Sequence, residues 1–150
     1  MAANPQISPA PLGDLTARLR RNSRKVTAPR QALLEILRRH RRPLTIKELH
    51  GALSAIDCDL ATVYRSLRLL EEIGIVKRLD FGEGAARFEF IEDEAQAHHH
   101  HLICTRCTEI VKLDECCLPD FNDARVGTAH GFKNVSHRLE FFGLCPNCQG

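Results

Sequence analysis

The chain has 150 residues, which is enough for one ordinary domain or two small ones and too few for a large α/β enzyme. Hydrophobic residues make up 43% of it and charged residues 27%, a composition typical of a soluble globular protein. No stretch approaches the roughly 18 consecutive apolar residues that a membrane span requires, and segment 1–13 lacks the apolar region of a signal peptide. The composition predicts a cytoplasmic protein that begins with a flexible tail over 1–13.

The charges are unevenly distributed. The net charge of the whole chain is only +2, but residues 1–92 carry a net +5 and residues 93–150 a net −3. Segment 18–42 contains ten basic side chains and a single acid, Glu35. Such a field suits a polyanion, although a solvated helical face would explain it as well. The two parts of the chain are therefore expected to have different partners.

Apolar periodicity and capping residues predict three helices in the first part of the chain. The N-caps are Thr27, Asp59 and Thr45, which opens the capping box Thr45-Ile46-Lys47-Glu48. Gly74 supplies the left-handed stop of the third helix. The helices are expected over 28–39, from 45 to about 56, and from 59 to 73.

Two strands follow the helices. They are expected over 75–81 and 87–91, joined by a turn at 82–85 whose glycines permit a positive φ. Three helices followed by a β-hairpin is the order of a winged helix-turn-helix. We therefore predict a DNA-binding domain over 14–92.

The third helix and the hairpin carry the candidate DNA contacts. With the apolar stripe of this helix in the core, its other side chains would face the major groove, and the hairpin's Lys77, Arg78 and Arg87 would form the wing. Tyr64 taken alone could equally be a half-buried aromatic residue with its hydroxyl in water. The candidate DNA-binding residues are Lys25, Arg30, Ala61, Thr62, Tyr64, Arg65, Arg68 and Arg78.

The second part, 98–150, follows a polar hinge over 93–97. It is expected to contain a strand at 110–113, a helix from about Leu118 to His130 that Gly131 ends, and strands at 132–136 and 138–142. About 50 residues bury too little apolar surface to be stable unaided. A metal, an oligomer interface or both should complete this small α/β unit.

Two Cys-x-x-Cys pairs are the most specific motif of the chain. They are Cys104-Thr105-Arg106-Cys107 and Cys145-Pro146-Asn147-Cys148, and four thiolates form a closed tetrahedral zinc site. A thioredoxin-like redox pair is the alternative for either motif alone, but neither has a βαβ context. The other three cysteines, Cys58, Cys116 and Cys117, fit buried thiols or auxiliary soft ligands equally well and are left unassigned.

Four consecutive histidines, His98, His99, His100 and His101, precede the first cysteine pair. In an extended segment, alternate side chains point to opposite faces, so the run offers two pairs of imidazoles to two separate metal sites. A solvated polar loop is the alternative. A mixed histidine and carboxylate site suits exchangeable Fe(II), Mn(II) or Zn(II). Candidate further ligands are Glu89, Glu92, Asp114, Glu115, Asp120 and His137.

With these residues in place, the chain resembles the ferric uptake regulator family of bacterial metal-dependent repressors across about residues 20–148. The resemblance is carried by Val26 to Gln31, Asp59 to Leu67, His98 to Cys107, and His137 to Cys148. It implies an α+β chain in which a winged-helix domain is hinged to an α/β dimerisation domain. A metal-loaded homodimer would bind a palindromic operator on double-stranded DNA and repress genes of metal acquisition.

The resemblance also implies three metal sites. The structural zinc falls on Cys104, Cys107, Cys145 and Cys148, the regulatory hinge site on Glu89, His99 and His101, and a second regulatory site on His98, His100 and His137 with an acid from Asp120 or its neighbours. Pro43 stands where the first domain usually supplies a histidine, so His40 is the candidate replacement. Lys112 and His100 replace a glutamate and an aspartate of the family pattern.

We therefore expect a metal-dependent repressor of metal-homeostasis genes, with structural zinc and a regulatory Fe(II), Zn(II) or Mn(II), rather than an enzyme. Within the family, a zinc uptake regulator and an iron-based peroxide sensor are the alternatives. Outside it, a small zinc hydrolase would need three ligands, an open coordination position and a general base, of which only the ligands are visible.

Overall fold

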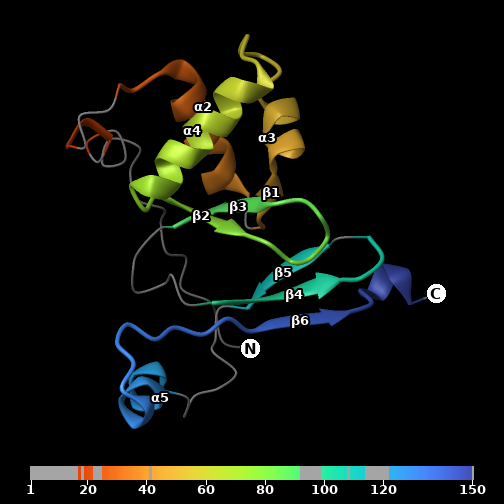
Figure 1. Ribbon diagram of the computed structural model, residues 1–150. Coiled ribbons are helices and arrows are strands. Elements are labelled where there is room, and N and C mark those ends of the chain that lie inside the picture. The colour runs from red at the N-terminus through yellow and green to blue at the C-terminus, as the bar shows by residue number, and fades with distance from the viewer. Residues whose placement is uncertain are drawn as a thin grey trace, which may run out of the picture. The chain divides into compact units, whose positions relative to one another are not determined.

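The computed structural model describes residues 17, 19–21, 25–40, 42–91, 99–107, 109–113 and 122–149. They belong to two compact units, Met1–Ala97 and His98–Gly150, each of which mixes helices with a three-stranded sheet (Figure 1). The α+β class is confirmed. The predicted tail at 1–13, the hinge at 93–97, and His98, Cys116, Cys117 and Asp120 lie outside the described residues.

Three helices of the first unit begin where the capping residues place them. They are α2 (Ala28–Arg39), α3 (Ile46–Ala52) and α4 (Leu60–Glu72). Thr45 and Glu48 form both hydrogen bonds of the capping box, and the Asp59 carboxylate accepts from the Thr62 N–H at 2.7 Å. Gly74, with φ +69°, follows α4 as predicted. Thr27 is the N-cap of α2 but makes no side-chain capping bond.

Helix α3 ends at Ala52 and not near Ile56, as the apolar periodicity predicted. The Leu53 N–H donates back to Leu49 and His50, and the Ile56 N–H then closes a turn on the Leu53 carbonyl at 2.8 Å. Leu53 is buried in this turn. The apolar spacing therefore predicted the burial of Leu53 correctly, but the buried residues continue past the end of the helix, so the predicted helix end was too late.

The sheet of the first unit has the strand order β1-β3-β2. Strands β2 (Val76–Leu79) and β3 (Arg87–Phe90) form the predicted antiparallel hairpin, with Gly82 and Gly84 in the turn at φ +80° and +78°. The third strand, β1 (Leu44–Thr45), pairs with β3 and was not predicted. The three helices pack together against this sheet, and this arrangement is that of a winged helix (Figure 1).

One continuous core joins the helices to the sheet. Leu19 is fully buried in it and lies in a helical stretch for which no element was predicted. The other buried members are Leu33, Leu34, Leu37, Leu44, Leu49, Leu53, Val63, Leu67, Leu70, Ile75, Val76 and Phe88.

The second unit is built on strands β4 (His100–Cys104), β5 (Ile110–Leu113) and β6 (Glu140–Gly143), in the order β5-β4-β6. β4 runs antiparallel to β5 and parallel to β6. The strand predicted at 138–142 corresponds to β6, which begins two residues later than predicted. The strand expected at 132–136 was wrong, because that segment has no strand pairing.

Helix α5 (Asp123–His130) is shorter than predicted. Asn122 has an extended backbone and caps the helix by accepting from the Arg125 N–H at 3.1 Å, so no helix passes through it from Leu118. Gly131, with φ +73°, ends α5 as predicted. None of the helices that the structure describes is long and apolar enough to cross a membrane.

Candidate metal centres and nucleic-acid interface

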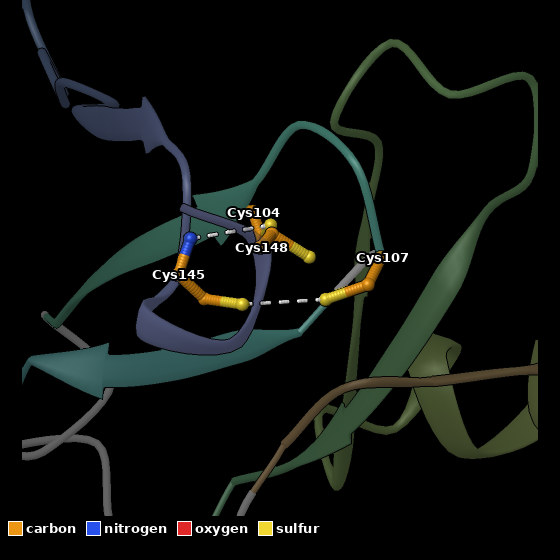
Figure 2. Close-up of side chains that lie close together, drawn as sticks. All are labelled: Cys104, Cys107, Cys145 and Cys148. Carbon is orange, nitrogen blue, oxygen red and sulfur yellow. Dashed lines mark hydrogen bonds between the residues drawn. The ribbon is translucent and has the colours of Figure 1, made fainter. Parts of the chain in front are cut away.

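The four cysteines of the two Cys-x-x-Cys pairs converge at one end of the second sheet (Figure 2). Cys104 ends β4 and Cys107 follows in the turn, whereas Cys145 is the N-cap and Cys148 the last residue of the short 3-10 helix η2 (Pro146–Cys148). Their sulfurs all lie within 4.8 Å of one another, and the Cys107 and Cys145 sulfurs are 3.5 Å apart. Four sulfurs on a tetrahedral zinc would be about 3.8 Å apart, so this spacing fits the ion.

Strand pairing brings the two distant motifs together. In the parallel β4/β6 pair, Cys104 lies opposite Gly143, two residues before Cys145. The Thr105 N–H donates to the Gly143 carbonyl at 2.9 Å, and the Arg106 guanidinium donates to the Cys148 carbonyl at 2.6 Å. Strand pairing and these two hydrogen bonds therefore bring the motifs together, and all four thiols are free.

Hydrogen bonds shift the pKa values of two of the four thiols in opposite directions. Backbone N–H groups, first that of Cys145 and then those of Cys107 and Arg106, lower the pKa of Cys104 to about 6. The side-chain hydrogen bond with Cys107 is the main cause that raises the pKa of Cys148 to about 12. Four neighbouring sulfurs cannot ionise together unless a cation compensates their charge. The donor set is thus suited to a soft divalent ion such as zinc.

The other predicted ligands of the second unit lie on two faces of β4. His99, directly before the strand, and buried His101 have their ring centroids 4.8 Å apart, and Lys112 pairs opposite His101. Glu89, which is 8% exposed, lies on β3 of the first unit, and His40 is exposed at the C-cap of α2.

His100 faces the opposite side of β4 from His101 and is buried beside His137, with ring centroids 5.6 Å apart. Its Nδ1 is 3.0 Å from the Leu139 carbonyl, and His137 Nδ1 is 2.7 Å from the Asp123 carboxylate. The expected acid was Asp120 or one of its neighbours; Asp120 lies outside the described residues, and the acid that the structure places against His137 is Asp123, the first residue of α5. Its signal in the sequence was the Asn122 cap, because acids are common in the first turn that follows such a cap.

Helix α4 presents two contrasting faces. Val63, Leu67 and Leu70 are fully buried, whereas Tyr64 is 53% exposed, and Ala61, Arg65 and Arg68 are also exposed. The Arg65 guanidinium donates to the Thr62 hydroxyl at 3.1 Å. A hollow of about 210 Å³ lies beside this face, lined in part by Tyr64, Arg68 and Arg78. Of the other candidates, Lys25 is exposed, and half-buried Arg30 donates to the Lys25 carbonyl at 2.6 Å.

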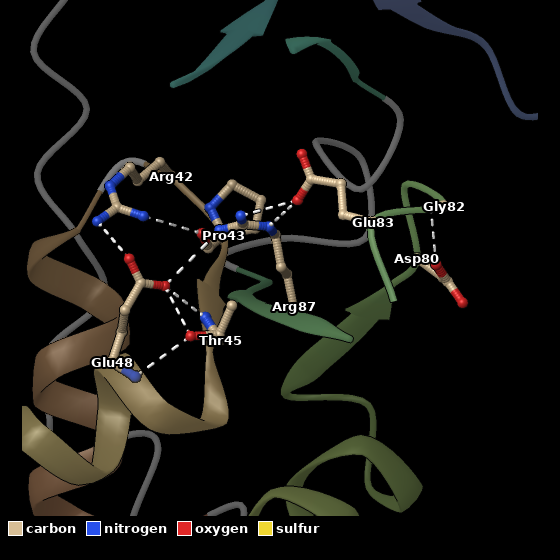
Figure 3. A network of polar contacts seen from close by, with 8 residues as sticks. All are labelled: Arg42, Pro43, Thr45, Glu48, Asp80, Gly82, Glu83 and Arg87. Atoms are coloured by element: carbon tan, nitrogen blue, oxygen red, sulfur yellow. Dashed lines mark hydrogen bonds and ion pairs between the residues drawn. The ribbon is translucent and has the colours of Figure 1, made fainter. Parts of the chain in front are cut away.

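The assignment of Arg87 to the DNA-facing wing was wrong. Its side chain is only 5% exposed and forms ion pairs with Glu83 at 2.9 Å and Glu48 at 3.6 Å (Figure 3). Charge counting along the strand could not identify these two acids, which lie on a turn and on a helix. Lys77 is half-buried and Arg78 is exposed on β2.

The comparisons with known proteins agree with these motifs. The model of the ferric uptake regulator family matches residues 21–142. The chain is 34% identical over 142 residues to the peroxide-responsive repressor PerR of Staphylococcus saprophyticus, covering 92% of this chain and 91% of that protein. It is 32% identical over 135 residues to the ferric uptake regulation protein of Bacillus subtilis, covering 88% and 90%. Its fold matches that of the Helicobacter pylori ferric uptake regulator Fur with a TM-score of 0.74 at 24% identity, covering 93% and 91% of the two chains. The protein therefore belongs to the ferric uptake regulator family of metal-responsive regulators.

Proposed function

We propose that this protein is a cytoplasmic, homodimeric, metal-dependent transcriptional repressor that binds a palindromic operator on double-stranded DNA. The observation that carries the proposal is the two-faced α4, whose apolar stripe is buried while Tyr64, Arg65 and Arg68 face outward. A helix in this place of a winged helix-turn-helix enters the major groove. Arg65 and Arg68 offer forked donors to base edges or phosphates, while Lys25, Arg30 and Arg78 supply phosphate contacts.

The second unit is proposed as the dimerisation domain. Val111, Leu102 and Phe141 lie side by side in the strand register, and they are 48%, 41% and 37% exposed. Together they form an apolar row across β5, β4 and β6 of the kind that marks interaction surfaces. A second copy of the same sheet is its proposed occupant, and the resulting two-fold symmetry would match a palindromic operator.

Three metal sites are proposed. The four cysteines would hold structural zinc, which supplies the positive charge that four clustered thiolates require. Glu89, His99, His101 and His40 would form the regulatory hinge site. His100 and His137, with His98 and either Asp120 or Asp123, would form a second regulatory site. In both sites the neutral imidazoles and the carboxylates are the ligands, so protonation of the histidines weakens binding.

The regulatory signal has three candidates, of which zinc supply is one. Because one relative is a ferric uptake regulation protein and another a peroxide-responsive repressor, control by iron supply and control by peroxide are both supported. Family membership favours a regulator over the zinc hydrolase. The test is DNA selection with the pure protein, followed by binding titrations with buffered Fe(II), Zn(II) and Mn(II). Loss of binding when peroxide is added to the iron form but not to the zinc form would identify a peroxide sensor.

Arg65→Ala is the sharpest variant for this test. It should weaken binding to the selected duplex by about tenfold, the effect of losing one forked base or phosphate contact, while zinc content and dimer mass remain unchanged. Arg125→Ala, which removes an exposed arginine of α5, is the matched control and should bind as the parent does. Equal affinity of the parent and Arg65→Ala, or turnover of esters or peptides by the pure protein, would contradict the proposal.

A further inference from the structure

Arg87 is a buried cation for which the proposed DNA contacts provide no role. It is the first residue of β3 and follows the turn 82–85 of the β-hairpin after one intervening residue. Its Nε and Nη2 both donate to Glu83 Oε2, at 3.2 and 2.9 Å, and its Nη1 lies 3.6 Å from Glu48 Oε2. One planar guanidinium therefore links an acid of the turn to an acid of α3 (Figure 3).

Glu48 has other partners that do not depend on Arg87. Its carboxylate accepts from the Thr45 N–H at 2.7 Å and from Arg42 Nη2 at 2.8 Å. These bonds fix Glu48 at the start of α3. Arg87 thus connects the turn to a point that is already rigid.

The turn itself needs such an anchor. Residues 82–85 are all exposed, and two of them are glycines with positive φ, the residue type that loses the most backbone entropy on ordering. The Gly82 N–H donates to the Asp80 carboxylate at 2.9 Å, which is a bond within the turn's own neighbourhood. The bonds from Arg87 to Glu83 connect the turn to β3 of the same hairpin, and the ion pair of Arg87 with Glu48 at 3.6 Å extends this connection to α3.

We propose that Arg87 is a positioning residue that holds the tip of the wing in one place relative to α3, and so sets where the wing meets the DNA backbone. This inference rests on the proposed DNA-binding function. Arg87 itself does not touch DNA. Loss of Arg87 leaves the capping box of α3 intact and releases the turn, so the consequence is local to the wing.

The test uses the full-length, zinc-loaded protein and a duplex selected with the parent protein. In the DNA-free state, Arg87→Gln should speed hydrogen exchange at the amides of 80–86 by about tenfold, while the amides of α4 keep their protection. The same variant should weaken DNA binding about fivefold, as expected when a charge-assisted contact that orders a binding element is lost. Arg87→Lys should recover part of both effects, because a single ammonium still reaches Glu83. Arg42→Gln removes one partner of Glu48 Oε1 but keeps the Thr45 bond to Oε2, the oxygen that faces Arg87, so exchange at 80–86 should be unchanged.

The Glu83→Ala variant distinguishes the positioning of the wing from the electrostatic effect of the Glu83 charge on DNA binding. Removing an acid near DNA should tighten binding if only electrostatics matters, whereas loss of the anchor should weaken it, together with faster exchange at 80–86. It also tests the contact should Arg87→Gln fail to fold. Unchanged exchange at 80–86, equal acceleration throughout the first unit, or tighter binding by Glu83→Ala would overturn the inference and leave the DNA-binding function standing. A parent protein that selects no duplex would overturn both.

Discussion

At the residue scale, Glu48 shows how local bonds determine a charge. Burial acts to raise its pKa, but hydrogen bonds from Arg42 and Thr45 outweigh burial and hold the pKa below the ordinary 4.5. The folded protein therefore keeps this carboxylate ionised at a pH where the unfolded chain binds a proton.

This shift predicts a pH dependence of stability. Because the unfolded state binds more protons as the pH falls below 4.5, the contribution of Glu48 is complete above that pH and is lost through the lower folded pKa. Glu48→Gln should be less stable than the parent at neutral pH, and the gap should close in acid. Urea unfolding followed from about pH 6 to about pH 3 measures it. A gap that stays constant with pH would contradict the assigned pKa shift.

Helix caps and stops, which depend on nearby residues, could be predicted from the sequence, whereas the burial of a charged side chain by distant residues could not. The capping box, the Asp59 cap and the glycines after α4 and α5 depend on residues within three or four positions, and the structure confirms them. The burial of Arg87 depends on Glu48, which is 39 positions away. Strand alternation alone does not say which of two faces a charged side chain takes.

At the element scale, two helical glycines have opposite surroundings. A Cβ on Gly127 of α5 would lie 2.8 Å from both the Phe132 carbonyl oxygen and Val135 Cγ2, whereas a Cβ on Gly51 of α3 would meet nothing within 4 Å. The close approach at Gly127 lets the chain turn back beneath α5, where the Phe132 N–H donates to the Gly127 carbonyl at 2.8 Å.

The same substitution should therefore have opposite signs at the two sites. Gly127→Ala should destabilise the second unit by about 1–3 kcal/mol through overpacking, whereas Gly51→Ala should stabilise the first unit by about 0.5–1 kcal/mol through helix propensity. Denaturant unfolding of the zinc-loaded protein gives both values. Two changes of the same sign would show that the close contacts at Gly127 relax without cost.

Element boundaries were less predictable than element types. Helices α3 and α5 were each expected to be longer. Apolar residues continue beyond α3 into the turn that follows it, and Asn122 caps α5 where the predicted helix was expected to pass through. Strand β1 has only two residues, too few to show alternation, and it exists because β3 offers it an edge. The segment 132–136 pairs with none of the described strands, and its apolar residues Phe132 and Val135 are three positions apart, which is not the alternation of a strand.

At the scale of the whole molecule, the two units differ in how they are stabilised. Of the buried apolar residues in the described chain, only Ile103, Cys104 and Ile110 belong to the second unit. The first unit has a continuous apolar core of its own. This difference in buried apolar residues supports the expectation that the second unit needs a metal, a partner or both.

Removal of the structural metal should accordingly unfold one unit and spare the other. A strong chelator, or Cys104→Ser, should abolish the β4–β6 signals of the second unit, since zinc-binding energy of about 10–16 kcal/mol is also folding energy. The helices of the first unit should persist. Backbone NMR spectra recorded with zinc analysis of the same sample make the comparison. A zinc-free second unit with intact sheet signals would rule out the structural role.

The metal-site motifs were the most predictable part of the molecule, because the spacing of Cys-x-x-Cys and the alternation of histidines are local properties. The convergence of Cys104 with Cys145 required the parallel β4/β6 pair, which periodicity did not reveal. The pairing of His137 with Asp123 likewise depends on the return of the chain after α5.

Strand β4 serves two groups of side chains at once. His100 and His101 point to opposite faces of the strand, and the strand ends at Cys104 three positions later. Lengthening β4 by one amino acid between His101 and Cys104 would invert the orientation of every imidazole relative to the thiols, while adding two would restore orientation but displace the imidazoles by about 6.6 Å. Insertions and deletions should therefore be excluded from this short interval.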